Sequence, residues 1–213
     1  MDQGHIGVDE SGKGDFFGPL VIAACYVGPE HLAELDGVKD SKKLTDKVAL
    51  ALAPRIARVC PHAIISIGPL KYNELYEKMR NLNRMLAWGH AKAIENVLEI
   101  QPASLAISDQ FADPSGLRRA LQEKGRQITL ESRVRAEADI AVAAASVLAR
   151  ADFLRKLDRL SEEAGTTLPK GAGPQVLEAA ERLARKHGPS IFEKFAKVHF
   201  KTRTDALKRA NLL

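Results

Sequence analysis

The chain has 213 residues, of which 45% are hydrophobic and 28% charged, and this length allows one sizeable hydrophobic core. No apolar run approaches the roughly 20 residues that a membrane-spanning helix needs. The first ten residues, MDQGHIGVDE, lack the basic and apolar regions of a signal peptide. The sequence therefore argues against a membrane protein and against a secreted precursor.

Net charge and cysteine usage indicate the kind of binding partner and the cellular location. The formal net charge is +5, which is compatible with a polyanionic partner without establishing one. Cys25 and Cys60 both lie among apolar residues, so we expect buried, reduced thiols rather than a disulfide. Reduced thiols fit a cytoplasmic protein.

Five segments have the apolar patterning of strands, and the segments between them have helical spacing or helix caps. In chain order the predicted strands are 4–9, 19–28, 62–68, 103–109 and 126–131. The predicted helices are 46–60, 81–100, 114–124 and 136–160, and the chain from Pro174 on has a helical, basic pattern.

This order of elements indicates the fold class. Strands come first, then strands alternate with helices, and helices alone follow. Such an order predicts an α/β fold around one mixed five-stranded sheet flanked by helices. We expect a single domain over residues 1–213, with a helical C-terminal region at about 174–213.

Four carboxylates are candidates for a shared site. Asp9 and Glu10 end the first predicted strand and Asp109 ends the fourth, and ligand sites gather at the strand ends of α/β sheets. Glu137 opens the alanine-rich helix, whose small side chains four and seven positions on would let it lie close against the sheet. Such a cluster needs cations to stay charged, and oxygen-only ligands suit Mg²⁺ or Mn²⁺.

Each of these residues also has an ordinary structural interpretation. An aspartate at a strand end is often a turn former or a helix cap, and Glu137 alone would most often be a first-turn residue favoured by the helix dipole. The glycines Gly12, Gly14 and Gly18 alone suggest a tight turn between strands. Composition and spacing thus lead to an α/β domain that is a candidate metal-dependent enzyme.

Four segments resemble motifs of the type 2 ribonucleases H, the family of ribonucleases HII and HIII. Residues 9–23, DESGKGDFFGPLVIA, are similar to its D-E-x-G-x-G-x-x-x-G-P signature, and residues 40–44 to its D-S-K-K-L. Residues 107–111, ISDQF, resemble the segment with the third acid, and residues 136–150, AEADIAVAAASVLAR, the segment with the fourth. The four segments occur in the family's order.

Within this family the chain is most similar to ribonuclease HIII. The features are Gly14-Asp15 followed by FFGP, the DQF after the third acid, and AKVHFKT at 196–202. A glutamate as the fourth acid, here Glu137, is also the HIII version. Two departures stand beside these features. The catalytic motif begins at residue 6, so we expect the N-terminal substrate-binding domain that HIII proteins usually carry to be missing. The G-K-G at 12–14 is close to the junction-reading motif of ribonuclease HII, which leaves the choice of specificity open.

The resemblance implies a ribonuclease H-like fold and an endonuclease that cleaves the RNA strand of RNA/DNA hybrids, leaving 5′-phosphate and 3′-hydroxyl ends. It implies a two-metal site for Mg²⁺ or Mn²⁺ on four residues that are both catalytic and metal-binding: Asp9, Glu10, Asp109 and Glu137. It also implies substrate contacts from Gly12, Lys13, Gly14, Ser41, Lys42 and Lys43.

Several alternatives stay open. The chain could nick DNA at single ribonucleotides as ribonuclease HII does, cut DNA, or bind nucleic acid without catalysis. Asp139 competes with Glu137 as the fourth acid, and we favour Glu137 because it shares a helix face with small residues. We expect a monomer. Basic C-terminal residues are candidates for gripping the duplex or for a solvated helix face: Lys186, Lys194, Lys197, Lys201 and Arg203.

Overall fold

The structure is a computed structural model that describes residues 4–38, 44–109 and 114–213, and the side chain of Glu137 also lies outside what it describes. These residues form two compact units. The first consists of Met1–Ser11, Val21–Ile65 and Asn81–Asp152, and the second of Gly12–Leu20, Ser66–Arg80 and Phe153–Leu213. The expectation of a single domain stays a prediction.

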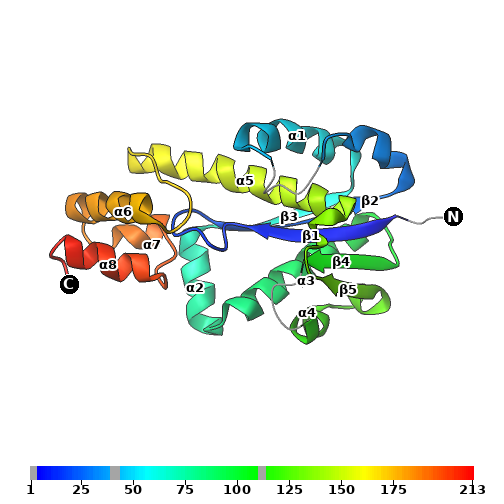
Figure 1. Ribbon diagram of the computed structural model, residues 1–213. Coiled ribbons are helices and arrows are strands. Elements are labelled where there is room, and N and C mark those ends of the chain that lie inside the picture. Colours follow the sequence, from blue (N-terminus) through cyan, green and yellow to red (C-terminus); the bar gives the residue numbers. More distant parts are fainter. Residues whose placement is uncertain (1–3, 39–43, 110–113) are drawn as a thin grey trace. The chain divides into compact units, whose positions relative to one another are not determined.

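A mixed five-stranded sheet of order β3-β2-β1-β4-β5 is the centre of the first unit (Figure 1). Strand β1 pairs antiparallel with β2 and parallel with β4, and β4 pairs parallel with β5. The strands are β1 (His5–Ser11), β2 (Leu20–Val27), β3 (His62–Ile67), β4 (Leu105–Asp109) and β5 (Thr129–Arg133). The predicted mixed sheet and all five predicted strands are confirmed.

Helices cover both faces of this sheet: α1 and α5 lie on one face, and α3 and α4 on the other (Figure 1). Every residue of β2 is buried, as a strand covered on both faces requires. The helices are α1 (Asp46–Val59), α3 (Leu82–Ile100), α4 (Pro114–Ala120) and α5 (Ile140–Ala164). Short 3-10 helices are η1 (Pro29–Leu35), η3 (Gly125–Gln127) and η4 (Ala136–Ala138).

Helix α5 begins at Ile140, so the prediction of a helix from residue 136 was wrong at its start. Asp139 has extended backbone angles and ends the 3-10 turn η4, which contains Glu137. Oδ1 of Asp139 accepts hydrogen bonds from the amides of Ala141 and Val142, at 2.9 and 3.1 Å. Asp139 thus caps α5, and helical spacing cannot be used to assign a face to Glu137.

The start of α5 lies directly against β1, as the small side chains led us to expect. A Cβ atom added to Gly7 of β1 would lie 2.1 Å from backbone atoms of Ala141 and Val142. Glycine at position 7 is therefore required by the close approach of the helix backbone. This contact fixes α5 beside the strand that carries Asp9 and Glu10.

The second unit contains the loop Gly12–Leu20 together with α2 (Pro69–Met79) and the C-terminal helices. These are α6 (Pro174–His187), α7 (Ile191–Phe195) and α8 (Lys201–Arg209), in the region predicted to be helical. The sequence pattern did not predict α2. Phe16 and Phe17 are fully buried, and the Phe16 ring lies 5.5 Å from that of Phe192. The two loop phenylalanines are core residues.

Cys25 and Cys60 are buried and free of disulfides, as expected from the sequence. In the described ranges, no helix combines the length and the apolar character needed to cross a membrane.

Candidate active site

Asp9 lies near the C-terminal end of β1, and Asp109 is the last residue of the neighbouring parallel strand β4. Val8 of β1 pairs with Ser108 of β4, so the next residue on each strand is an aspartate. Asp9 is 6% exposed and accepts a hydrogen bond from Ser146 of α5. The sheet therefore brings two of the four predicted acids together on the side covered by α5.

The electrostatics of Asp9 favour a nearby cation. The pKa of Asp9 is raised to about 7, first by burial and then by the negative charges of Glu10 and Asp109, while the hydrogen bonds from Ser146 and from the Glu10 amide act in the opposite direction. A carboxylate held among like charges away from water is stabilised when a positive charge neutralises it. The raised pKa of Asp9 is what a metal-free metal ligand is expected to have.

Glu10 is directed to the opposite face of the sheet, since side chains alternate along a strand. Its Oε2 accepts a hydrogen bond of 3.0 Å from Nε2 of His90 on α3. His90 is fully buried, and its Nδ1 lies 3.2 Å from Oγ of Ser108. The imidazole of His90 thus links Ser108, the residue before Asp109, to Glu10, the residue after Asp9. Our sequence analysis did not find His90, although it lies four residues from Leu86 and from Ile94, both on the buried side of its helix.

The turn that carries Glu137 is attached to the third acid. The amide of Ala136 donates a hydrogen bond of 3.1 Å to Oδ1 of Asp109. Asp139 instead lies 2.8 Å from Nε2 of His5, at the other end of β1. Burial alone would raise the pKa of Asp139, but the hydrogen bonds from His5 and from the Val142 and Ala141 amides lower it below its usual value. Asp139 therefore has partners other than the predicted acids.

The donor set fits a hard divalent cation in its chemistry. All four predicted ligands supply carboxylate oxygens, which Mg²⁺ and Mn²⁺ prefer. Among the described side chains, no three His, Cys, Asp or Glu residues are arranged to hold a metal ion together. The side chain of Glu137 is outside that set. Two acids and the turn of the fourth lie on one side of the strand ends, and Glu10 lies on the other.

Gly12 and Gly14, the two glycines of the G-K-G turn, have different surroundings. Gly12 has a φ of +87°, and a Cβ there would lie 2.2 Å from the carbonyl oxygen of Pro19. The protein's own fold thus requires Gly12. Gly14 has no neighbouring atom within 4 Å of an added Cβ. The fold therefore leaves open space beside Gly14.

Of the D-S-K-K-L segment, only Leu44 belongs to the described residues. Ser41, Lys42 and Lys43 lie outside the described residues. The residue that follows them, Leu44, accepts a hydrogen bond of 3.0 Å at its carbonyl oxygen from Nη1 of Arg150. Arg150 belongs to α5, so the end of the D-S-K-K-L segment is attached to the helix that contacts Asp9.

The basic C-terminal residues differ in their burial and in their ion-pair partners. Lys197 is fully buried, which contradicts both interpretations from the sequence, a duplex grip and a solvated face. Lys194 is paired with Glu163 at 3.0 Å, and Lys201 lies 3.9 Å from Asp205. Lys194 and Lys201 are exposed, so a contact with nucleic acid stays a prediction for them.

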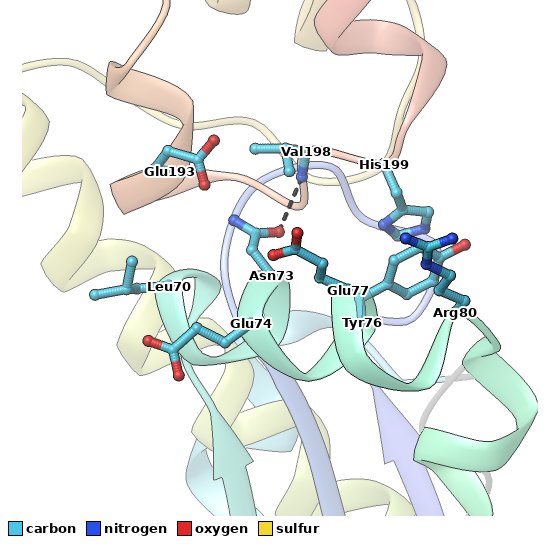
Figure 2. Close-up of a pocket in the computed structure, with 9 residues that line it drawn as sticks. All are labelled: Leu70, Asn73, Glu74, Tyr76, Glu77, Arg80, Glu193, Val198 and His199. Carbon is cyan, nitrogen blue, oxygen red and sulfur yellow. Dashed lines mark hydrogen bonds between the residues drawn. The ribbon is translucent and has the colours of Figure 1, made fainter.

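A cavity of about 470 Å³ opens between α2 and the segment after α7 within the second unit (Figure 2). The rings of Tyr76 and His199 stack there with centroids 4.0 Å apart. Its wall carries the glutamates Glu74, Glu77 and Glu193 and the single arginine Arg80. An excess of negative charge repels phosphate, so we do not assign this cavity to the nucleic-acid backbone.

The chain is similar to known proteins over most of its length. A family model described as Ribonuclease HII matches residues 6–203. Ribonuclease HIII of Protochlamydia amoebophila is 46% identical over 200 residues, which are 93% of this chain and 66% of that protein. Ribonuclease HIII of Chlamydia pneumoniae is 49% identical over 204 residues, 93% of this chain and 68% of that protein. The chain thus spans about two thirds of the length of these curated relatives. Among solved structures, Bst-RNase HIII in complex with Mn²⁺ superposes with a TM-score of 0.90 at 38% identity, covering 98% of this chain and 70% of that one.

Proposed function

The chain belongs to the ribonuclease HII family, and from this premise we propose that it is an endonuclease that hydrolyses the RNA strand of an RNA/DNA hybrid. Its ribonuclease HIII relatives support a hydrolase acting on phosphodiester bonds. Products with 5′-phosphate and 3′-hydroxyl ends follow from the same proposal.

One observation carries the proposal: Asp9, near the end of β1, lies next to Asp109, the last residue of the parallel strand β4, and the turn with Glu137 is bonded to Asp109. Asp9, Asp109 and the backbone turn of Glu137 come from distant parts of the sequence and lie where ligands bind in α/β sheets. Asp9 is buried among negative charges, and its pKa of about 7 supports a cation beside it.

The carboxylates would hold Mg²⁺ or Mn²⁺, and the relative crystallised with Mn²⁺ supports a divalent metal. When bound, such ions polarise a phosphate and make water a stronger nucleophile at neutral pH. Asp9, Glu10, Asp109 and Glu137 are the residues that we propose as ligands. Ser146 orients the carboxylate of Asp9, and His90 orients that of Glu10.

Substrate recognition is proposed for the G-K-G turn and the D-S-K-K-L segment. The open space around Gly14 leaves room for a nucleic-acid strand to approach the backbone. Backbone groups there could bond the ribose 2′-hydroxyl, which distinguishes RNA from DNA. Lys13, Ser41, Lys42 and Lys43 would contact phosphates. Because the curated relatives are ribonucleases HIII, we expect a continuous hybrid to be preferred over a single embedded ribonucleotide.

The proposal is tested by assaying a labelled RNA/DNA hybrid with Mg²⁺ and comparing Asp109→Asn with Asp158→Asn. Asp158 is an exposed aspartate of α5 and serves as the matched control. We expect the wild type and Asp158→Asn to cleave the RNA strand and Asp109→Asn to lose nearly all cleavage. Equal cleavage by all three folded proteins would contradict the proposed site.

We also propose a cellular location and an oligomeric state. Free, buried thiols at Cys25 and Cys60 support a cytoplasmic location. A monomer is our expectation, and sedimentation analysis of the purified chain tests it.

A further inference from the structure

The loop Gly12–Leu20 is held by the segment that follows α7. The amide of Gly18 donates to the carbonyl oxygen of Phe195 at 3.1 Å, and the amide of Lys197 donates to that of Phe16 at 2.9 Å. Phe17 and Ala196 form an isolated β-bridge between these hydrogen bonds. The backbone of the loop is therefore bonded to the backbone of residues 195–197.

The side chain of Lys197 adds a second set of bonds to the same loop. Its Nζ donates to the carbonyl oxygens of Asp15 and Gly18, at 2.8 and 2.7 Å. The residue is fully buried, and Nζ lies 5.5 Å from the centre of the Tyr72 ring. One ammonium group thus joins two points of the loop that are three residues apart.

Burying an ammonium group so that it joins two carbonyl groups costs desolvation free energy. Burial lowers the pKa of Lys197 to about 7, and the negative charge of Asp15 only partly opposes this. A methionine would fill the same space without the desolvation cost. A lysine at this position is explained if the shape of the loop serves substrate binding as well as stability.

Lys197 is itself held in place from α2. Nδ2 of Asn73 donates to the carbonyl oxygen of Ala196 at 2.9 Å. Oδ1 of the same residue accepts from the amide of Val198 at 3.0 Å (Figure 2). Both neighbours of Lys197 are bonded to one asparagine, so the lysine extends toward the loop from a fixed backbone.

We infer that Lys197 is a positioning residue that holds the Gly12–Gly18 loop in the shape that binds the hybrid. The inference rests on the proposed function, because the loop contacts substrate only if the chain binds RNA/DNA hybrid. Because Lys197 is buried, it acts on substrate through the loop that it bonds. Its loss should weaken substrate binding and leave the chemistry at the carboxylates nearly unchanged.

The test compares Lys197→Met with Lys71→Met in steady-state cleavage of a continuous hybrid. Lys71 is a residue of α2 to which no substrate contact is assigned, with a side chain that is 61% exposed. For Lys197→Met we expect KM to rise about tenfold and kcat to stay within about twofold of the wild type, and Lys71→Met should leave both near wild type. A folded Lys197→Met protein with unchanged KM would overturn the inference.

Amide hydrogen exchange gives a second, independent reading. In the free wild type the amides of Phe16 and Gly18 should be protected, and in Lys197→Met they should exchange about tenfold faster or more. If Lys197→Met does not fold, the same exchange measurement is made on Lys197→Gln, whose shorter side chain loses the two ammonium bonds: faster exchange at Phe16 and Gly18 supports the inference, and exchange as slow as in the wild type overturns it. A wild type that cleaves no hybrid would remove the proposed function, while the exchange measurement would still decide whether Lys197 holds the loop.

Discussion

The amide of Ala136 donates a hydrogen bond to Oδ1 of Asp109, and this bond joins the turn of the fourth acid to the third. The following residue is Glu137, whereas Asp139 lies beside His5 and caps α5. The two candidates for the fourth acid therefore have different surroundings. This geometry favours Glu137 by an argument different from the helix-face argument of the sequence.

Glu137→Gln is expected to lower kcat on a hybrid by about a hundredfold or more, because several kcal/mol of transition-state stabilisation depend on the metal ligands. Its free energy of unfolding should stay close to wild type. Asp139→Asn should keep near-normal turnover and lose about 1 kcal/mol of stability, since the asparagine still caps α5 but no longer carries a charge beside His5. Single-turnover kinetics and denaturant unfolding measure both. The reverse pattern in folded proteins would make Asp139 the fourth acid.

Gly12→Ala and Gly14→Ala separate the two glycines of the turn. At position 12 a Cβ meets the Pro19 carbonyl oxygen in a backbone with φ of +87°, so we expect a loss of about 1–3 kcal/mol in the free energy of unfolding. At position 14 the added methyl has open space, so stability should not change and affinity for the hybrid should fall. Unchanged hybrid affinity in Gly14→Ala would show that no strand approaches this residue closely.

His90→Leu should weaken Mn²⁺ binding about 10- to 100-fold, because the imidazole that orients Glu10 is lost. Calorimetric titration of the protein with Mn²⁺, without substrate, measures this directly. His187→Leu is the control, since His187 is an exposed residue of α6. A folded His90→Leu protein that binds Mn²⁺ as tightly as the control would remove His90 from the site.

The pKa of Asp9 predicts how the metal-free protein responds to pH. Its folded pKa of about 7 lies above the ordinary value of 3.8, so the folded state holds an extra proton between these values. The free energy of unfolding in chelator should therefore fall as pH rises through this window, by at most about 1.4 kcal/mol per pH unit. Asp9→Asn should lack this contribution to the slope. Stabilisation by added Mg²⁺ should grow over the same window, since the metal binds the ionised carboxylate. Identical slopes for the wild type and Asp9→Asn would contradict the pKa.

The sheet could be predicted from the sequence because its strands are short apolar runs with clear ends. The register of β1 on β4 then placed Asp9 next to Asp109, as the two strand-end acids had suggested. Helix α2 was missed because its sequence, PLKYNELYEKM, has few apolar residues and only a weak helical pattern.

The start of α5 and the role of Lys197 could not be predicted from local pattern. Asp139, which ends the 3-10 turn, also bonds His5, which is 134 residues away in the sequence. Lys197 bonds Asp15 across 182 residues. Contacts between residues so far apart in the sequence cannot be predicted from helical spacing or composition. A lysine in a basic segment is therefore interpreted as surface charge.

The central claim is metal-dependent cleavage of the RNA strand of a hybrid. The most direct measurement incubates the wild type with a labelled continuous RNA/DNA hybrid, and separately with a DNA duplex that contains one ribonucleotide, each with Mg²⁺ or with excess chelator. We predict efficient cleavage of the continuous hybrid with Mg²⁺, leaving 5′-phosphate and 3′-hydroxyl ends, weaker nicking at the single ribonucleotide, and no cleavage in chelator. Full activity in chelator, or cleavage of neither substrate by the folded protein with Mg²⁺, would contradict the account.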